Sequence, residues 1–110
     1  MTTINSMPLK SGEAKINLQK GSLSTEGLAI KVSGANNGVV LYYDCASATP
    51  ITFKGGDTVF GGDFTVTVPG GEGYCALDIG AAIQKSGTYK DHILLTAATN
   101  DCSVGLIELI

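Results

Sequence analysis

Short apolar stretches, separated by glycine-rich turns, run along the whole chain. In the stretch from Asp63 to Val68, Phe64, Val66 and Val68 fall on one face, and polar residues fall on the other. A period of two residues is that of a β-strand with one buried face. The pattern predicts strands at Ala14–Leu18, Leu28–Ser33, Val39–Asp44, Ile51–Phe53, Thr58–Phe60, Phe64–Val68, Tyr74–Ile79, Ile93–Ala97 and Ser103–Leu109.

Turn-forming residues stand between these strands, as in Gly34 to Gly38 and Pro69 to Gly73. Such spacing predicts an all-β fold: an antiparallel β-sandwich of the jelly-roll kind, or a small β-barrel. Gly80 to Ser86 is the one short helical candidate. The first dozen residues contain Pro8 and only scattered apolar positions. We therefore expect an N-terminal arm at residues 1–12, rather than a strand, followed by a single β-domain at residues 13–110.

Two of the strands carry apolar side chains on both faces. Val39–Tyr43 is apolar throughout, and the last strand has Val104 and Leu106 on one side and Ile107 and Leu109 on the other. Such strands are covered on both faces within the monomer or buried against another subunit; a bulge at Gly105 is an alternative explanation. The residues expected at an interface are Met1, Ile4, Met7, Leu9, Val40, Tyr42, Ile107 and Leu109.

The charge of the chain narrows its partners. The 110 residues carry a net charge of −3, with seven scattered lysines and no arginine. Nucleic-acid binding depends on a basic surface that neutralises phosphates, so we expect no nucleic-acid partner. No apolar run approaches the roughly 18 residues that span a bilayer, so no membrane partner is expected either. The first residues lack the pattern of a secretory signal peptide.

The three cysteines are Cys45, Cys75 and Cys102. Their odd number and wide spacing fit neither a disulfide framework nor a zinc site. Each lies in or beside an apolar run, so we expect all three to be buried, reduced thiols. That interpretation implies synthesis in a reducing cytoplasm.

A near-repeat, FKGGDTV followed by FGGDFTV, places Gly-Gly-Asp before two apolar stretches. Glycine supplies the backbone conformation of a tight turn and aspartate caps it, so two tight turns are the expected structure. The alternative is a calcium site with Asp57, Asp63 and Glu72 as ligands. Its spacing matches neither an EF-hand loop nor a β-helix repeat, which favours the turns.

No residue pattern indicates catalysis. His92 is the only histidine and directly precedes an apolar run, where a polar strand end is the ordinary explanation. The segment Ala76 to Ala81 resembles the Asp-Thr-Gly-Ala loop of retroviral-type aspartic proteases, but Ile79 replaces the hydroxyl residue of that loop. A strand that ends at Asp78 before a short helical turn explains it better. We expect no enzyme, and no catalytic, cofactor-binding or metal-binding residues.

The polar segment Met1 to Gly12, the glycine-punctuated strands and the closing apolar segment Ser103 to Leu109 together resemble the small decoration, or cement, proteins of tailed bacteriophages. The resemblance implies a non-enzymatic virion protein that binds the major capsid protein on the capsid exterior and stabilises it. It also implies self-association, with a trimer as the first expectation. The alternative is a carbohydrate-binding or adhesive β-module in which Tyr42, Tyr43, Tyr74 and Tyr89 supply stacking surfaces. A small hydrolase that uses His92 is a third alternative.

Overall fold

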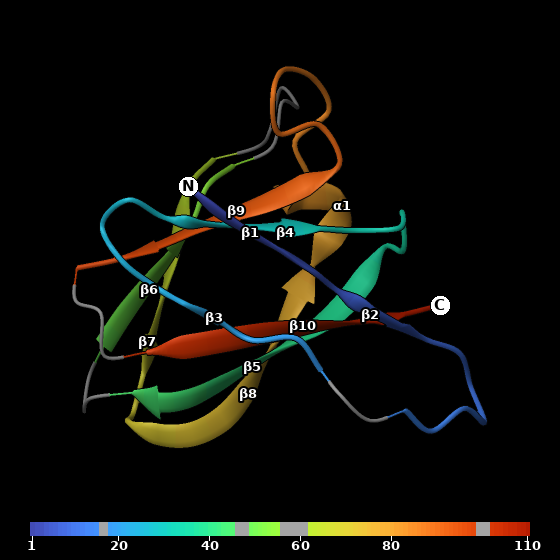
Figure 1. The fold of residues 1–110 in the computed structure, drawn as a ribbon, viewed down its shortest axis with the longest axis horizontal. Coiled ribbons are helices and arrows are strands. Elements are labelled where there is room, and N and C mark those ends of the chain that lie inside the picture. The colour runs from blue at the N-terminus through green and yellow to red at the C-terminus, as the bar shows by residue number, and fades with distance from the viewer. Residues whose placement is uncertain (16–17, 46–48, 56–61, 99–101) are drawn as a thin grey trace.

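Two five-stranded sheets pack face to face in the computed structural model (Figure 1), which describes residues 1–15, 18–45, 49–55, 62–98 and 102–110. Sheet A has the order β1 (Thr2–Asn5), β4 (Leu28–Lys31), β9 (His92–Ala97), β6 (Thr49–Phe53) and β7 (Phe64–Val68). Sheet B has the order β2 (Met7–Leu9), β10 (Ser103–Leu109), β5 (Asn37–Cys45) and β8 (Gly71–Asp78), with β3 (Gly21–Ser22) also paired to β10. Each sheet ends in its own edge strands, so the described residues form a sandwich and not a closed barrel.

The core lies between the sheets and follows from the alternation of side chains along each strand. In β10, Val104 and Leu106 are fully buried, and in β9 Ile93 and Leu95 are fully buried. Phe53 at the end of β6 is the largest of the fully buried side chains. The all-β prediction is confirmed: the single described helix is α1 (Ile79–Ala82), which has four residues and is too short to cross a membrane.

Seven predicted strands are present, and two of them, β7 and β10, have the predicted bounds. The prediction at Ala14–Leu18 is wrong for its described residues, because Ala14, Lys15 and Leu18 are not in a strand. The predicted strand at Thr58–Phe60 lies outside the described residues. The helix is shorter than the candidate Gly80 to Ser86 and starts one residue earlier.

The N-terminal residues form two strands, so the expectation of an arm without strands is wrong. β1 pairs with β4, and β2 pairs with the end of β10 (Figure 1). Both pairs are parallel, so the two sheets are mixed rather than purely antiparallel. Pro8 is tolerated because β2 is an edge strand, where one backbone N–H is not needed by a neighbour.

Gly105 marks a close approach and not a bulge. The register between β10 and β5 runs without a shift from Ser103 to Leu109. A Cβ atom at Gly105 would lie 2.8 Å from the carbonyl oxygen of Gln19 and 2.9 Å from the side chain of Leu18. Glycine therefore lets residues 18–19 lie against the outer surface of sheet B.

The different burial of two apolar side chains leads to a stability prediction. Leu77 in β8 is 4% exposed, whereas Phe64 at the start of β7 is 39% exposed and stacks on Phe53 with ring centroids 4.9 Å apart. We expect Leu77→Ala to lower the free energy of unfolding by about 2–5 kcal/mol because it leaves a cavity. Phe64→Ala is expected to cost roughly 1–2 kcal/mol, since a large part of the Phe64 side chain is already exposed to water in the folded protein. Urea unfolding midpoints measure both, and equal losses would contradict the burial difference.

Candidate interaction surface

Sheet B presents an apolar surface on the side that faces away from the core. Its six residues, here called the sheet B outer face, come from three neighbouring strands: Val39, Leu41, Tyr74, Ala76, Ile107 and Leu109. The strand register places Ile107 beside Val39 and Val39 beside Ala76, with Leu41 beside Tyr74 in the next row. Tyr74 is 77% exposed and Leu109 is 48% exposed. None of the six carries a charge, so they form one apolar area on a regular sheet.

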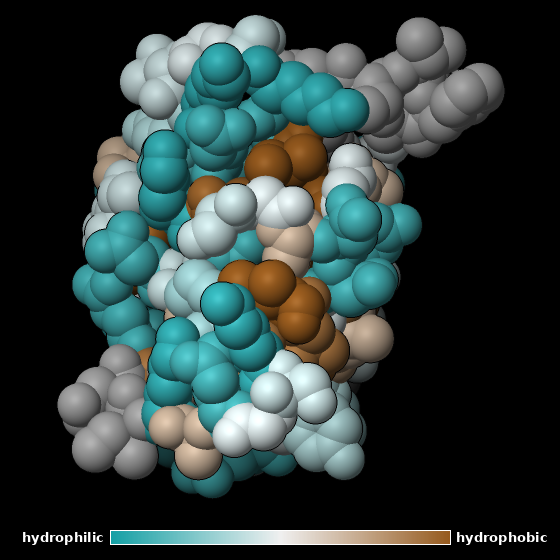
Figure 2. All heavy atoms as spheres, turned by 90° about the vertical axis from the view of Figure 1, so that its right-hand side faces the viewer, coloured by the Kyte–Doolittle hydropathy of each residue, from teal (hydrophilic) through white to brown (hydrophobic). Residues whose placement is uncertain are grey.

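Two residues of the segment before β3 cover one end of this surface. Leu18 lies over Gly105, and the ammonium group of Lys20 lies 3.9 Å from the ring centroid of Tyr43. A cation over an aromatic face is a favourable contact. The cover reaches one end of β5 and β10, and Tyr74, Ala76 and Leu109 remain exposed. Hydrophobic patches between hydrophilic side chains are also visible on the side of the molecule where the C-terminus lies (Figure 2).

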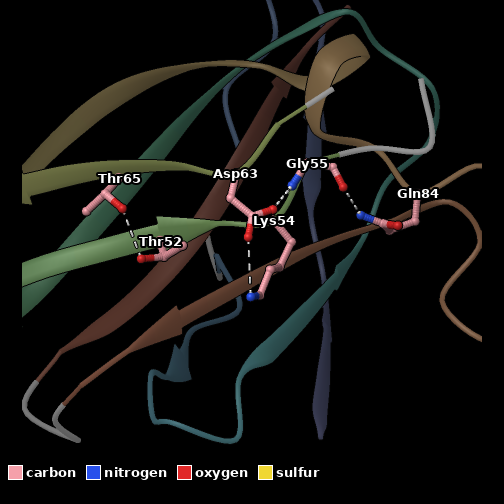
Figure 3. Close-up of polar contacts among 6 residues, drawn as sticks. All are labelled: Thr52, Lys54, Gly55, Asp63, Thr65 and Gln84. Carbon is pink, nitrogen blue, oxygen red and sulfur yellow. Dashed lines mark hydrogen bonds and ion pairs between the residues drawn. The ribbon is translucent and has the colours of Figure 1, made fainter. Parts of the chain in front are cut away.

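The outer surface of sheet A has a different character. Thr65 and Thr67 of β7 and Thr52 of β6 point away from the core, and the hydroxyl groups of Thr52 and Thr65 lie 3.1 Å apart (Figure 3). Hydroxyl groups on a β-sheet favour contact with water, which is the usual pattern for a half-buried antiparallel pair. Of these two surfaces, the sheet B outer face is therefore the one suited to a protein partner.

The expected interface residues divide into three groups. Ile4, Val40 and Tyr42 are buried between the sheets, so the expectation that they lie on the surface of the folded chain is wrong. Met7, Leu9 and Ile107 are half-buried, and Met1 and Leu109 are exposed. The error at β5 is one of phase: both Val39 and Val40 are apolar, so the sequence alone does not show which of them faces outwards. Tyr42 faces inwards because its ring lies against Gly73, which has no side chain.

A buried carboxylate at Glu108 joins three parts of the chain, and the sequence analysis did not identify it. Glu108 is 0% exposed although it lies near the end of β10. Its oxygens accept hydrogen bonds from the backbone N–H of Ser33 at 2.9 Å and of Ala35 at 3.3 Å. The hydroxyl of Ser6, between β1 and β2, donates a further short hydrogen bond. A buried polar group needs such partners, and here they fix where the N-terminal residues cross from sheet A to sheet B.

Cys45 and Cys102 form a disulfide, so the expectation of three reduced thiols is wrong for these two residues. Their Cα atoms lie 4.3 Å apart, and their positions in the sequence differ by 57. Cys45 ends β5 and Cys102 directly precedes β10, which brings the two together because β5 and β10 are paired. Cys75 is the only free cysteine of the described residues. The expectation of synthesis in a reducing cytoplasm requires all three cysteines to be thiols, and Cys45 and Cys102 no longer support that expectation.

The free thiol provides a pH-dependent prediction. Partial burial raises the pKa of Cys75 above its ordinary value of 9.0. Because the thiolate is the reactive form, we expect alkylation of folded protein to be slow at neutral pH and its pH midpoint to lie above 9.0. The unfolded chain loses this proton first as the pH rises, so Cys75 lowers stability at alkaline pH. Rates of iodoacetamide labelling, folded and in urea, measure the shift; equal midpoints would contradict it.

Side-chain contacts join the residue after β6 to the residue before β7 (Figure 3). Asp63 accepts a hydrogen bond from the backbone N–H of Gly55 at 2.8 Å and lies 3.4 Å from the ammonium group of Lys54. The hydrogen bond from Gly55, with Lys54 beside it, lowers the pKa of Asp63. The side-chain amide of Gln84 donates to the Gly55 carbonyl at 2.7 Å. The two tight turns expected at the Gly-Gly-Asp copies fall largely on residues 56–61, which lie outside the described residues.

The other candidate residues have structural partners. Of the residues in the calcium alternative, Asp57 lies outside the described residues, and no metal-binding cluster of His, Cys, Asp and Glu occurs in the described ranges. Asp78 caps α1 by accepting a hydrogen bond from the Ala81 N–H at 3.2 Å, which confirms the strand-then-helix interpretation. His92 starts β9, and its Nδ1 donates to the carbonyl of Lys90 at 2.8 Å.

An open groove of about 530 Å³ lies beside the N-terminal strands. It is lined by Asn5, Ser6, Met7, Pro8, Ala14, Lys15 and Gln19. The ammonium group of Lys15 donates a hydrogen bond to the Pro8 carbonyl at 2.5 Å across this region. The groove therefore separates the N-terminal strands from the segment that follows them, and its charged group is already engaged.

Comparison of the chain with protein-family models, with curated proteins and with solved structures finds no significant match. The chemistry of its surfaces is therefore the basis for a functional assignment.

Proposed function

We propose that the chain is a non-enzymatic virion structural protein that attaches to the exterior of a tailed-phage capsid through the sheet B outer face and stabilises the capsid mechanically. The observation on which the proposal depends is the uncharged apolar surface of Val39, Leu41, Tyr74, Ala76 and Ile107 on three hydrogen-bonded strands. An apolar surface built on paired strands suits a protein partner, since its backbone needs little ordering on binding. The major capsid protein is the proposed partner.

Charge and disulfide support an exterior position. A net charge of −3 without arginine is unfavourable beside packaged DNA. The Cys45–Cys102 disulfide is of a kind that persists in oxidising surroundings, such as those around a released virion. The protein would be made in the host cytoplasm and act on the virion. Many copies on one capsid would turn a modest affinity of each copy into strong collective attachment.

Self-association is the second part of the proposal, with a trimer as the first arrangement to test. A specific interface buries at least about 1,000 Å² in total. The sheet B outer face extends across three strands and continues to the exposed Leu109 at the end of β10, beside the exposed Ile110. Neighbouring copies would contact each other through one part of this surface. The adjacent part of the same sheet would bind the capsid.

The test of capsid attachment uses capsids from the same source that lack the protein. Purified chain is added, the capsids are sedimented, and the temperature at which they release their DNA is recorded with and without the chain. We expect co-sedimentation in a fixed ratio to the capsid protein and a higher release temperature. A chain that stays in the supernatant at all concentrations would refute the proposal.

One observation favours the alternative function of a carbohydrate-binding module. Tyr74 is 77% exposed beside Leu41 on the outer surface of sheet B, and an aromatic ring in that position can stack on the apolar face of a sugar. A glycan array with the wild-type chain and with Tyr74→Ala tests this alternative. Binding of a defined glycan that Tyr74→Ala abolishes would favour it over capsid attachment.

A further inference from the structure

The residues Met1 to Leu9, here called the N-terminal segment, close one edge of each sheet. β1 runs parallel to β4 in sheet A, and β2 runs parallel to β10 in sheet B. The segment therefore crosses from one sheet to the other, as the dark blue ribbon shows in Figure 1. Without it, β4 and the second half of β10 would each have an open edge, which is a template for another strand.

Most residues that contact this segment lie far from it in the sequence. Ile4 is 4% exposed and packs in the core. The hydroxyl of Ser6 donates to Glu108, and its backbone N–H donates to the carbonyl of Lys31 at 3.0 Å. The N–H of Ile110 donates to the carbonyl of Leu9 at 3.0 Å. Two hydrogen bonds join the segment to the connection that leads to β3: the Asn5 N–H donates to the Gln19 side chain at 2.9 Å, and the Lys15 ammonium group donates to the Pro8 carbonyl at 2.5 Å.

The end of that connection lies against sheet B, with Leu18 over Gly105 and Lys20 over Tyr43, whereas residues 10–15 lie away from the two sheets. Residues 10–15, 19 and 20 are all exposed, and of its described residues Leu18 alone is partly buried. Its first part forms a local turn in which the Glu13 N–H donates to the Lys10 carbonyl at 3.0 Å, with Gly12 at φ +87°. The open groove of about 530 Å³ separates it from the N-terminal segment. In Figure 1 this part of the chain extends away from the two sheets.

We propose that the N-terminal segment exchanges between copies of this chain, so that the segment of one copy fills the open edges of β4 and β10 in another. The occupant is an identical segment, because the receiving site fits this sequence: a core position for Ile4 and a carboxylate for Ser6. The exchanged and unexchanged forms have the same strand contacts, so the choice between them depends on concentration and on the connection. A short connection between a segment and its site supplies an effective concentration on the order of millimolar.

The strand register provides a direct test with purified protein, which does not depend on capsid attachment. Leu9 is the register partner of Leu109 across β2 and β10, and both side chains are accessible. Two single variants are made, Leu9→Cys and Leu109→Cys, each with Cys75→Ser, and one of them is labelled with ¹⁵N. They are mixed over a range of concentrations up to millimolar in mild urea, returned to buffer and gently oxidised. Mass spectrometry then identifies chains linked between the two variants.

The double variant Leu9→Cys/Leu109→Cys is the geometric control, because its two thiols must link within one chain when it is dilute. The matched control for chance collision is a mixture of Leu9→Cys with Phe64→Cys, since Phe64 is exposed on β7 at the far edge of sheet A. If Leu9→Cys or Leu109→Cys prevents folding, Met7→Cys and Ile107→Cys replace them in the same register.

Exchange predicts linked dimers between the Leu9→Cys and Leu109→Cys chains, at least tenfold more abundant than in the collision control. Their share should rise as the protein concentration approaches the millimolar range, where a second copy competes with the chain's own segment. The proposal is overturned if the double variant links within the chain while the mixture gives no more dimer than the control at any concentration.

Discussion

Reduction of the Cys45–Cys102 disulfide is expected to lower the free energy of unfolding by about 4 kcal/mol, from the loop-closure entropy of a cross-link that spans about 57 residues. The bond joins the end of β5 to the start of β10, and its loop contains β6, β7, β8 and β9. The unfolded chain therefore loses much freedom when the bond is present. Cys45 and Cys102 are 6% and 1% exposed, so the thiols also lose packing if they separate.

Urea unfolding of the oxidised chain, of the chain in dithiothreitol and of Cys45→Ala/Cys102→Ala measures this effect. The control is Cys75→Ser, which leaves the bond intact and is expected to unfold close to the wild type. The intact mass should rise by the mass of two hydrogen atoms on reduction, because each sulfur gains one. Equal unfolding midpoints for oxidised and reduced protein, or a mass that does not change on reduction, would show that the cross-link is not part of the native state.

Glu108→Ala is expected to cost about 3–5 kcal/mol, because it removes hydrogen bonds from two backbone N–H groups and one hydroxyl to a charged acceptor, each of which contributes roughly 1–3 kcal/mol. The substitution leaves the N–H groups of Ser33 and Ala35 and the hydroxyl of Ser6 without the acceptor that they share. The lost hydrogen bonds hold both the turn after β4 and the residue between β1 and β2, so the substitution loosens both places.

Ser6→Ala is the matched control, since it removes one donor and keeps the carboxylate with its two backbone partners. We expect it to cost about 1–3 kcal/mol, the range for one hydrogen bond to a charged group. Glu108→Gln keeps the shape of the side chain and should fall between the two. Chemical unfolding of the three variants measures the order of the effects. If Ser6→Ala destabilises the chain as much as Glu108→Ala, the carboxylate does not join the three segments as described.

The strands of this fold could be predicted from sequence where the alternation is local. β7 and β10 have the predicted bounds because each contains a full run of alternating or β-branched residues between turns. β1 and β2 have four and three residues, too few for a periodic pattern, and each forms only by parallel pairing with a strand far along the chain. β3 has two residues and exists only as a partner of β10.

The sheet B outer face, the disulfide and the Glu108 contacts could not be predicted from local sequence patterns, because they depend on how distant strands pair. Val39 and Val40 are equally apolar, and the contact of Tyr42 with Gly73 determines which of them faces outwards. The pairing of Cys45 with Cys102 follows from the register of β5 and β10, which the spacing of the cysteines does not reveal. Glu108 lies two residues after Leu106 in β10, so the alternation of side chains places it on the buried face. An acidic residue at a buried strand position is a sign that its carboxylate accepts hydrogen bonds from nearby backbone N–H groups.

The central claim is that the sheet B outer face attaches the chain to a capsid, and binding by two charge variants tests it most directly. Leu41→Lys places a charge on this surface beside Tyr74, while Thr67→Lys places the same charge on the outer surface of sheet A. A lysine at either outward position can extend its charged end into water, so both variants should fold. In co-sedimentation with capsids that lack the protein, we expect Thr67→Lys to bind as the wild type and Leu41→Lys to bind at least tenfold more weakly. Wild-type affinity for Leu41→Lys, with its fold confirmed by circular dichroism, would contradict the account.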